Sequence, residues 1–155
     1  MNYILIFAFG IGVVAGLRAL TAPAAVAWAA HLGWLHLNGS PLAFIASTWA
    51  LILFSALAIF EFVGDLLPTT PKRTAPGPLI ARIFSGGLCG ACVCASANQS
   101  LVVGVALGAI GAVVGAFAGY EIRKRLVTGL NIKDIFLAIT EDLIALGLAW
   151  FLLAR

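Results

Sequence analysis

The chain has 155 residues, of which 63% are hydrophobic and only 10% are charged. Its mean hydropathy of +1.11 shows that apolar character extends over nearly the whole length. Soluble domains carry about 25% charged residues, so this composition excludes a disordered chain, a water-exposed enzyme and a nucleic-acid-binding protein. Five spans of about 20 residues each leave room only for short loops. We therefore expect a single integral membrane domain over residues 1–155.

Five apolar runs predict an all-α transmembrane helical bundle of about five spans. The runs are Tyr3–Ala30, Leu42–Gly64, Leu79–Ala97, Leu101–Tyr120 and Ile135–Ala154. The first run is longer than the roughly 20 residues that a straight span needs, and Pro23 cannot donate a hydrogen bond to the carbonyl of Ala19. We therefore expect the first helix to be broken near Arg18–Pro23, with Thr21 helping to satisfy the freed backbone. A tilted and kinked helix is the simpler alternative.

Nine Lys and Arg residues against six Asp and Glu residues give a formal net charge of +3, and their distribution predicts the topology. Cationic side chains gather in Leu66–Pro78 and in Glu121–Lys133. The loops at His31–Pro41 and Asn98–Ser100 have none. Because cationic loops remain in the cytoplasm, five spans place the N-terminus in the cytoplasm and the C-terminus outside. We expect a multi-pass protein of the bacterial inner membrane.

Ionisable residues inside the apolar runs are the candidate functional residues, because a charge at the bilayer centre costs at least about 2.5 kcal/mol. They are Arg18, Glu61, Asp65, Arg82, Glu141 and Asp142. In one interpretation they form structural ion pairs, in which Arg18 pairs with Glu141 or Asp142. The same interpretation pairs Arg82 with Glu61 or Asp65. In the other interpretation these residues line a polar pathway or site.

Arg18 at a helix break predicts an anion site, since a guanidinium and the N-terminus of a half-helix attract the same ligand. The candidate substrate-binding residues are Arg18, Thr21, Arg73 and Arg82. The residues expected to balance charge or relay protons are Glu61, Asp65, Glu141 and Asp142. Arg73 lies in a loop rich in Pro and Thr that could clasp a phosphate or a lipid headgroup. The plainer interpretation of that loop is a stiff cytoplasmic connection.

Two further patterns have structural interpretations. The fourth run carries a close-packing face of glycines, which serves either the protein's own bundle or a homodimer; they are Gly104, Gly108, Gly111, Gly115 and Gly119. One helix cannot present Cys89, Cys92 and Cys94 to a single ion, so they are interpreted as small apolar fillers. We predict no metal, no cofactor and no catalytic residues, because no Ser/His/Asp or Cys/His arrangement is readable.

A distinctive pattern covers the first span and the loop after the second. It consists of Gly16-Leu17-Arg18, Thr21-Ala22-Pro23, Glu61, Gly64-Asp65, Pro68, Thr70-Pro71, Arg73-Thr74 and Arg82. In this pattern the chain resembles, from about residue 5 to residue 153, a family of small bacterial integral membrane proteins catalogued as a domain of unknown function. The resemblance implies a compact multi-span protein whose shared pattern includes Arg18, Asp65, Arg73 and Arg82. It implies no activity, substrate or cofactor.

These observations favour a small inner-membrane transporter or channel for an anionic solute or a phosphate-bearing lipid. Its expected partners are the lipid bilayer and either further copies of itself or another membrane-complex subunit, and nucleic acid is not among them. The alternative is a non-catalytic scaffold or assembly subunit of a larger membrane complex. An intramembrane lipid enzyme ranks last, for lack of a nucleophile or metal set. The surroundings of Arg18 distinguish transport from an architectural role, because an Arg18 that is salt-bridged, dry and without a cavity leaves only the architectural role.

Overall fold

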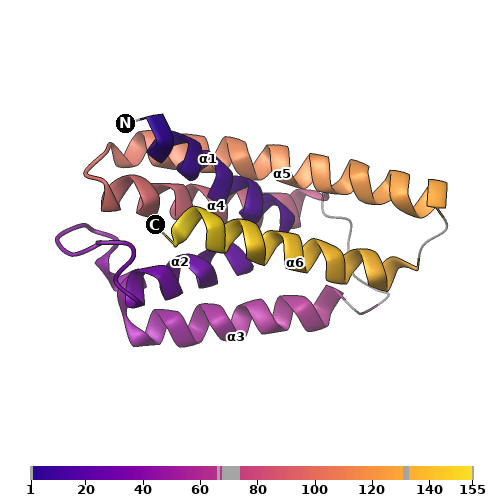
Figure 1. The fold of residues 1–155 in the computed structure, drawn as a ribbon, viewed down its shortest axis with the longest axis horizontal. Coiled ribbons are helices and arrows are strands. Elements are labelled where there is room, and N and C mark those ends of the chain that lie inside the picture. The colour runs from indigo at the N-terminus through magenta and orange to yellow at the C-terminus, as the bar shows by residue number, and fades with distance from the viewer. Residues whose placement is uncertain (1, 66, 68–73, 131–132, 155) are drawn as a thin grey trace.

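The computed structural model describes residues 2–65, 67, 74–130 and 133–154, and over these residues it contains helices and no strand (Figure 1). In chain order the elements are α1 (Asn2–Leu17), α2 (Thr21–His31), the short 3-10 helix η1 (Ala43–Ala46), α3 (Thr48–Asp65), α4 (Pro76–Ser96), α5 (Leu101–Leu130) and α6 (Asp134–Leu153). By length and composition, α3, α4, α5 and α6 suffice to cross a membrane, and α1 is a shorter apolar helix. The predicted all-α bundle is confirmed.

The first apolar run is broken between α1 and α2, as predicted, and the break also reverses the direction of the chain (Figure 1). Gly10 of α1 lies against Leu152 near the C-terminal end of α6. Trp34, three residues beyond α2, packs edge-on against Trp150 of the same helix, with ring centroids 4.9 Å apart. Both outer ends of the α1–α2 pair therefore lie at the same end of the bundle, and the two helices are antiparallel.

This reversal determines where the chain ends lie. The start of α1 and the end of α6 share one end of the bundle with the α2–α3 and α4–α5 connections (Figure 1). The ends of α3 and α5 lie at the other end. The expected loop at Glu121–Lys133 is mostly helical, since α5 continues to Leu130 and carries Arg123, Lys124 and Arg125 on its last turns. A single straight span over Tyr3–Ala30 would instead place the two chain ends on opposite sides.

Close backbone packing joins α1, α4 and α5. A Cβ added to Gly108 of α5 would fall within 3.0 Å of the backbone of Gly86 on α4, and one added to Gly16 of α1 would fall within 3.0 Å of the backbone of Ala112 and Ala116. Small residues permit such close approach between helices in a membrane. The α5 glycines from Gly104 to Gly115 therefore pack inside the bundle, which resolves the alternative of a homodimer face for these positions.

We expect Gly108→Ala to destabilise the protein by about 1–3 kcal/mol, because the methyl group overpacks a backbone contact that cannot yield. Gly147→Ala is the matched control, since Gly147 is an exposed glycine of α6 with open space around its Cβ position. Thermal unfolding in detergent measures both variants. Equal unfolding temperatures for the two variants would contradict the packing described for α4 and α5.

Candidate functional site

The carboxylate of Glu61, on α3, caps the beginning of α2. The main-chain amide of Ala19 donates to Glu61 Oε1 at 2.8 Å, and that of Leu20 donates to Oε2 at 2.9 Å. Free amides at a helix N-terminus attract anions, and two of them are satisfied here by one carboxylate. At the start of the half-helix, where the sequence predicts an anion, the amides are therefore bound by a side chain of the protein itself.

Two residues of α4 satisfy the carbonyls on the other side of the break. Arg82 Nη1 donates to the carbonyl of Gly16 at 2.5 Å and to that of Leu17 at 3.2 Å. The hydroxyl of Ser85 donates to the carbonyl of Ala19, which is the acceptor that Pro23 leaves without a helical donor. A cation at the C-terminal end of α1 also complements the helix dipole. Arg82 therefore binds main-chain carbonyls at the break and stabilises the end of α1.

Arg18 lies at the reversal itself, with only 1% of its side chain exposed. Its Nη1 bonds Asp65 Oδ2 of α3 at 2.5 Å, and its Nη2 pairs with Asp142 Oδ1 of α6. Its guanidinium carbon also lies 4.9 Å from the centre of the Phe62 ring, within the range of a cation–π interaction. Side chains from α3 and α6 therefore meet on one buried guanidinium.

The structure brings together five of the eight predicted site residues around the break: Arg18, Glu61, Asp65, Arg82 and Asp142. The Oε2 atom of Glu141 lies 3.9 Å from Nη1 of Arg123 on α5. Thr21 begins α2, but Ser85 takes the role of satisfying the freed backbone that was expected of Thr21. Arg73 lies outside the described residues.

One of the two predicted ion pairs is confirmed. The predicted pairing of Arg18 with Asp142 is present. Arg82 was expected to pair with Glu61 or Asp65. Its hydrogen bonds go to main-chain carbonyls instead, because the reversal leaves those acceptors without helical donors.

Sequence reasoning missed three residues of this region: Phe62, Ser85 and Arg123. Ser85 could have been found, since it lies three residues after Arg82 and therefore on the same face of the helix. Phe62 and Arg123 gave no signal, because an aromatic residue in an apolar span and a cation in a loop rich in Lys and Arg are both unremarkable. The residues that the structure describes include no group of three His, Cys, Asp or Glu side chains placed to hold a metal ion.

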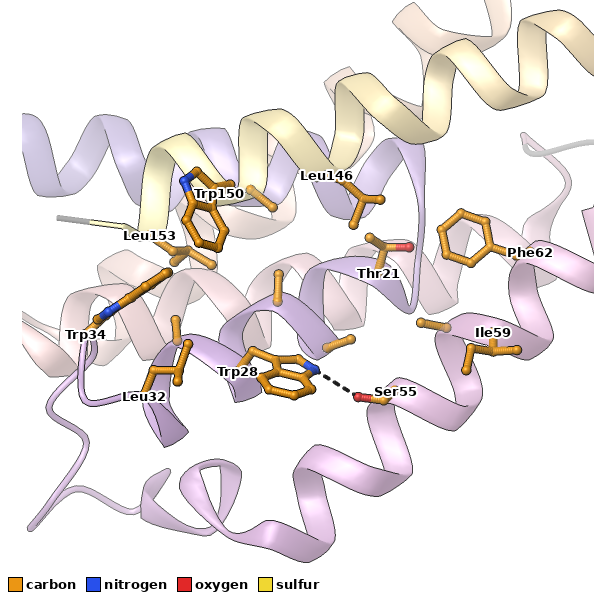
Figure 2. Close-up of a pocket in the computed structure, with 15 residues that line it drawn as sticks. Thr21, Trp28, Leu32, Trp34, Ser55, Ile59, Phe62, Leu146, Trp150 and Leu153 are labelled. Carbon is orange, nitrogen blue, oxygen red and sulfur yellow. Dashed lines mark hydrogen bonds between the residues drawn. The ribbon is translucent and has the colours of Figure 1, made fainter.

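An apolar cavity of about 390 Å³ lies beside the cluster, between α2, α3 and α6 (Figure 2). Two of its lining residues are Thr21, at the start of α2, and Phe62, whose ring also contacts the Arg18 guanidinium. Arg18 is therefore salt-bridged, and a cavity reaches its immediate neighbourhood. Arg18 is dry and salt-bridged, as the architectural interpretation expects, and it does not itself line the cavity. The presence of a cavity beside it is the one condition in which the structure differs from that interpretation.

The fold and the site define an α-helical membrane protein with a buried charge cluster at a chain reversal. The chain belongs to the family described as Domain of unknown function (DUF4126), whose model matches residues 5–154. This confirms the resemblance drawn from the sequence. A search of curated proteins finds no match, and a search of solved structures finds none either.

We expect strong energetic coupling between Arg18 and Asp142. Arg18→Gln alone leaves buried carboxylates without their cation and should cost about 3–5 kcal/mol of stability. The same change in an Asp142→Asn background should cost at least about 1 kcal/mol less. Unfolding free energies of the four proteins give the coupling energy.

The exposed pair of Glu121 and Arg125, one helical turn apart on α5 with 2.9 Å between Oε1 and Nε, serves as the control cycle. Its coupling should not exceed about 0.5 kcal/mol. Additive effects at Arg18 and Asp142 would refute the buried pair.

Proposed function

We propose that this protein is a small transporter of the bacterial inner membrane that carries an anionic solute or a phosphate-bearing lipid, with Arg18 binding the anion. The observation that carries the proposal is a buried guanidinium between two half-helices that already binds two carboxylates. A site that holds the protein's own carboxylates has the charge and the donors that a substrate anion requires. Intramembrane charge at a broken helix is also typical of transport sites.

Substrate binding requires exchange at Arg18. A substrate anion and both carboxylates cannot share one guanidinium, because the negative groups would repel one another strongly in a medium of low dielectric constant. The substrate therefore enters when Asp65 or Asp142 leaves the guanidinium or takes up a proton. In this scheme Glu61 and Glu141 balance the remaining charge, and Thr21 offers a hydroxyl three residues from Arg18. Arg82 holds the break, and Arg73 is the proposed headgroup contact in the α3–α4 connection.

The distribution of Lys and Arg supports an orientation for this transporter. The α3–α4 connection, the last turns of α5 and Lys133 carry most of the cations, which favours the cytoplasm for that end of the bundle. Since α1 begins at the other end, the proposed location of the N-terminus is the outer side. This revises the cytoplasmic N-terminus that five spans imply.

One observation favours a second function, that of a scaffold or assembly subunit. The carboxylates on Arg18 and the cap on α2 all belong to the protein itself, so the cluster is complete as architecture. A scaffold would contact its partner through other faces than the α5 glycines from Gly104 to Gly115, which pack inside the bundle.

Flux into liposomes tests the transport proposal. We expect the purified protein to carry at least one anion from a panel of inorganic, carboxylate and phosphate-bearing anions, and a proton gradient to stimulate that flux. Arg18→Gln should abolish the flux, and Asp142→Asn should remove its dependence on the proton gradient. Arg125→Gln is the control, since Arg125 is exposed on α5 and pairs with Glu121.

Two outcomes would count against transport. Wild-type protein indistinguishable from empty liposomes over the whole panel, with and without a proton gradient, would overturn the proposal. Purification in mild detergent with a stoichiometric second protein, together with silent liposomes, would favour the scaffold. Equal flux from wild type and Arg18→Gln would remove Arg18 from the mechanism.

A further inference from the structure

The cavity beside the charge cluster is a groove on the side of the bundle. Its floor is one face of α2, and its walls are α3 and α6 (Figure 2). Lining residues recur along α2 and its C-cap, from Thr21 to Leu32, which at 1.5 Å per residue gives a length of about 16 Å. The groove thus runs from the break towards the end of the bundle where the chain begins.

The walls of the groove are apolar and aromatic. Trp28 of α2 lies beside Ser55 of α3, Ile59 lies further along α3 towards Phe62, and Trp34 and Trp150 close the end remote from the break (Figure 2). The indole N–H of Trp28 donates to the hydroxyl of Ser55 at 3.1 Å, so this donor is already bound by the protein. A surface of this kind favours hydrocarbon over a free solute ion.

One polar group in the groove lacks a partner. Thr21 is 2% exposed, and its Oγ1 makes no hydrogen bond within the part of the chain that the structure describes. Ser85 already donates to the carbonyl of Ala19 that Thr21 was expected to help satisfy. Figure 2 shows the Thr21 hydroxyl pointing towards Phe62, at the end of the groove next to the break. A buried hydroxyl without a partner is costly, so an oxygen atom of a ligand would satisfy it.

The size and the position of the groove define its occupant. The cavity has a volume of about 390 Å³. This volume lies within the range of small-ligand pockets. Trp28, Ile59 and Trp150 are 49%, 62% and 64% exposed, so the groove opens along the side of the bundle that faces the hydrocarbon of a bilayer.

We propose that this groove binds the hydrocarbon chain of an amphiphile, with an oxygen of its polar head hydrogen-bonded to Thr21. A long-chain carboxylic acid and a phospholipid share this chemistry. The polar head would then lie at the break, beside Phe62 and the Arg18 cluster, and the chain would follow α2 towards Trp34. Binding at this site requires no transport, so it stands or falls separately from anion flux.

Tryptophan fluorescence tests the proposal directly, because three of the four tryptophans line the groove. In a Trp49→Phe background, which removes the exposed tryptophan at the start of α3, the detergent-solubilised protein is titrated with two probes. One is a long-chain fatty acid brominated on its chain, and the other is a phospholipid with one brominated chain. Saturable quenching by either probe supports the proposal and identifies the source of the chain.

Three variants make the test specific. Ala25→Phe fills the groove from the α2 floor and should weaken binding at least about tenfold. Ala56→Phe is the matched control, since Ala56 is exposed on α3 and does not line the groove. Thr21→Val should weaken binding about tenfold through the lost hydrogen bond. It removes an unpaired hydroxyl without changing the shape of the side chain, so it is expected to fold at least as well as the wild type.

Several results would overturn the proposal. Quenching that never saturates, or that is equal in Ala25→Phe and Ala56→Phe, would mean that the probes contact the protein surface generally. A dimer that Ala25→Phe dissociates, with no saturable probe binding, would assign the groove to a second copy of the chain. Wild-type affinity in Thr21→Val would show that no polar head is bound at the break.

Discussion

The hydrogen bonds that close the chain reversal between α1 and α2 are the interactions on which the rest of the structure depends. In hydrocarbon no water can replace a missing partner, and each unpaired backbone group costs several kcal/mol. Glu61 takes two amides at the start of α2, Arg82 takes two carbonyls at the end of α1, and Ser85 takes the carbonyl that Pro23 leaves free. The charges on Glu61 and Arg82 also match the dipoles of the helix ends that they cap.

The reversal divides the bundle into two unlike sides. On one side α1 packs backbone to backbone against α4 and α5 through glycines such as Gly16 and Gly108. On the other side the short helix α2 lies between α3 and α6 and leaves the groove open along the side of the bundle. The charge cluster lies where the two sides meet, since Arg18 bonds acids from α3 and α6 while Arg82 reaches the break from α4. The proposed anion site and the proposed amphiphile site therefore share one origin.

The sequence identified the components of this site but not their arrangement. Pro23 and an overlong apolar run predicted the break, and the intramembrane charges predicted most of the cluster. The reversal was not predictable, because helical periodicity and hydropathy carry no direction and 28 residues fit one tilted span or two antiparallel helices. The partners of Arg82 depend on carbonyls that only the reversal sets free. The groove was also not predictable from the sequence. The positions of Trp28, Trp34 and Trp150 are typical of an interfacial aromatic belt. Nothing in their spacing indicates that they line one cavity.

The sidedness of the chain tests the reversal most directly. Single cysteines replace Tyr3 at the start of α1, Asn38 in the α2–α3 connection and Lys124 on α5, in a protein whose three native cysteines are changed to alanine; all three positions are exposed. A membrane-impermeant maleimide is applied to spheroplasts, before and after lysis. The structure requires Tyr3→Cys and Asn38→Cys to react from the same side, and Lys124→Cys from the opposite side. Reaction of Tyr3→Cys from the side of Lys124→Cys would contradict the antiparallel α1–α2 pair and everything built on it.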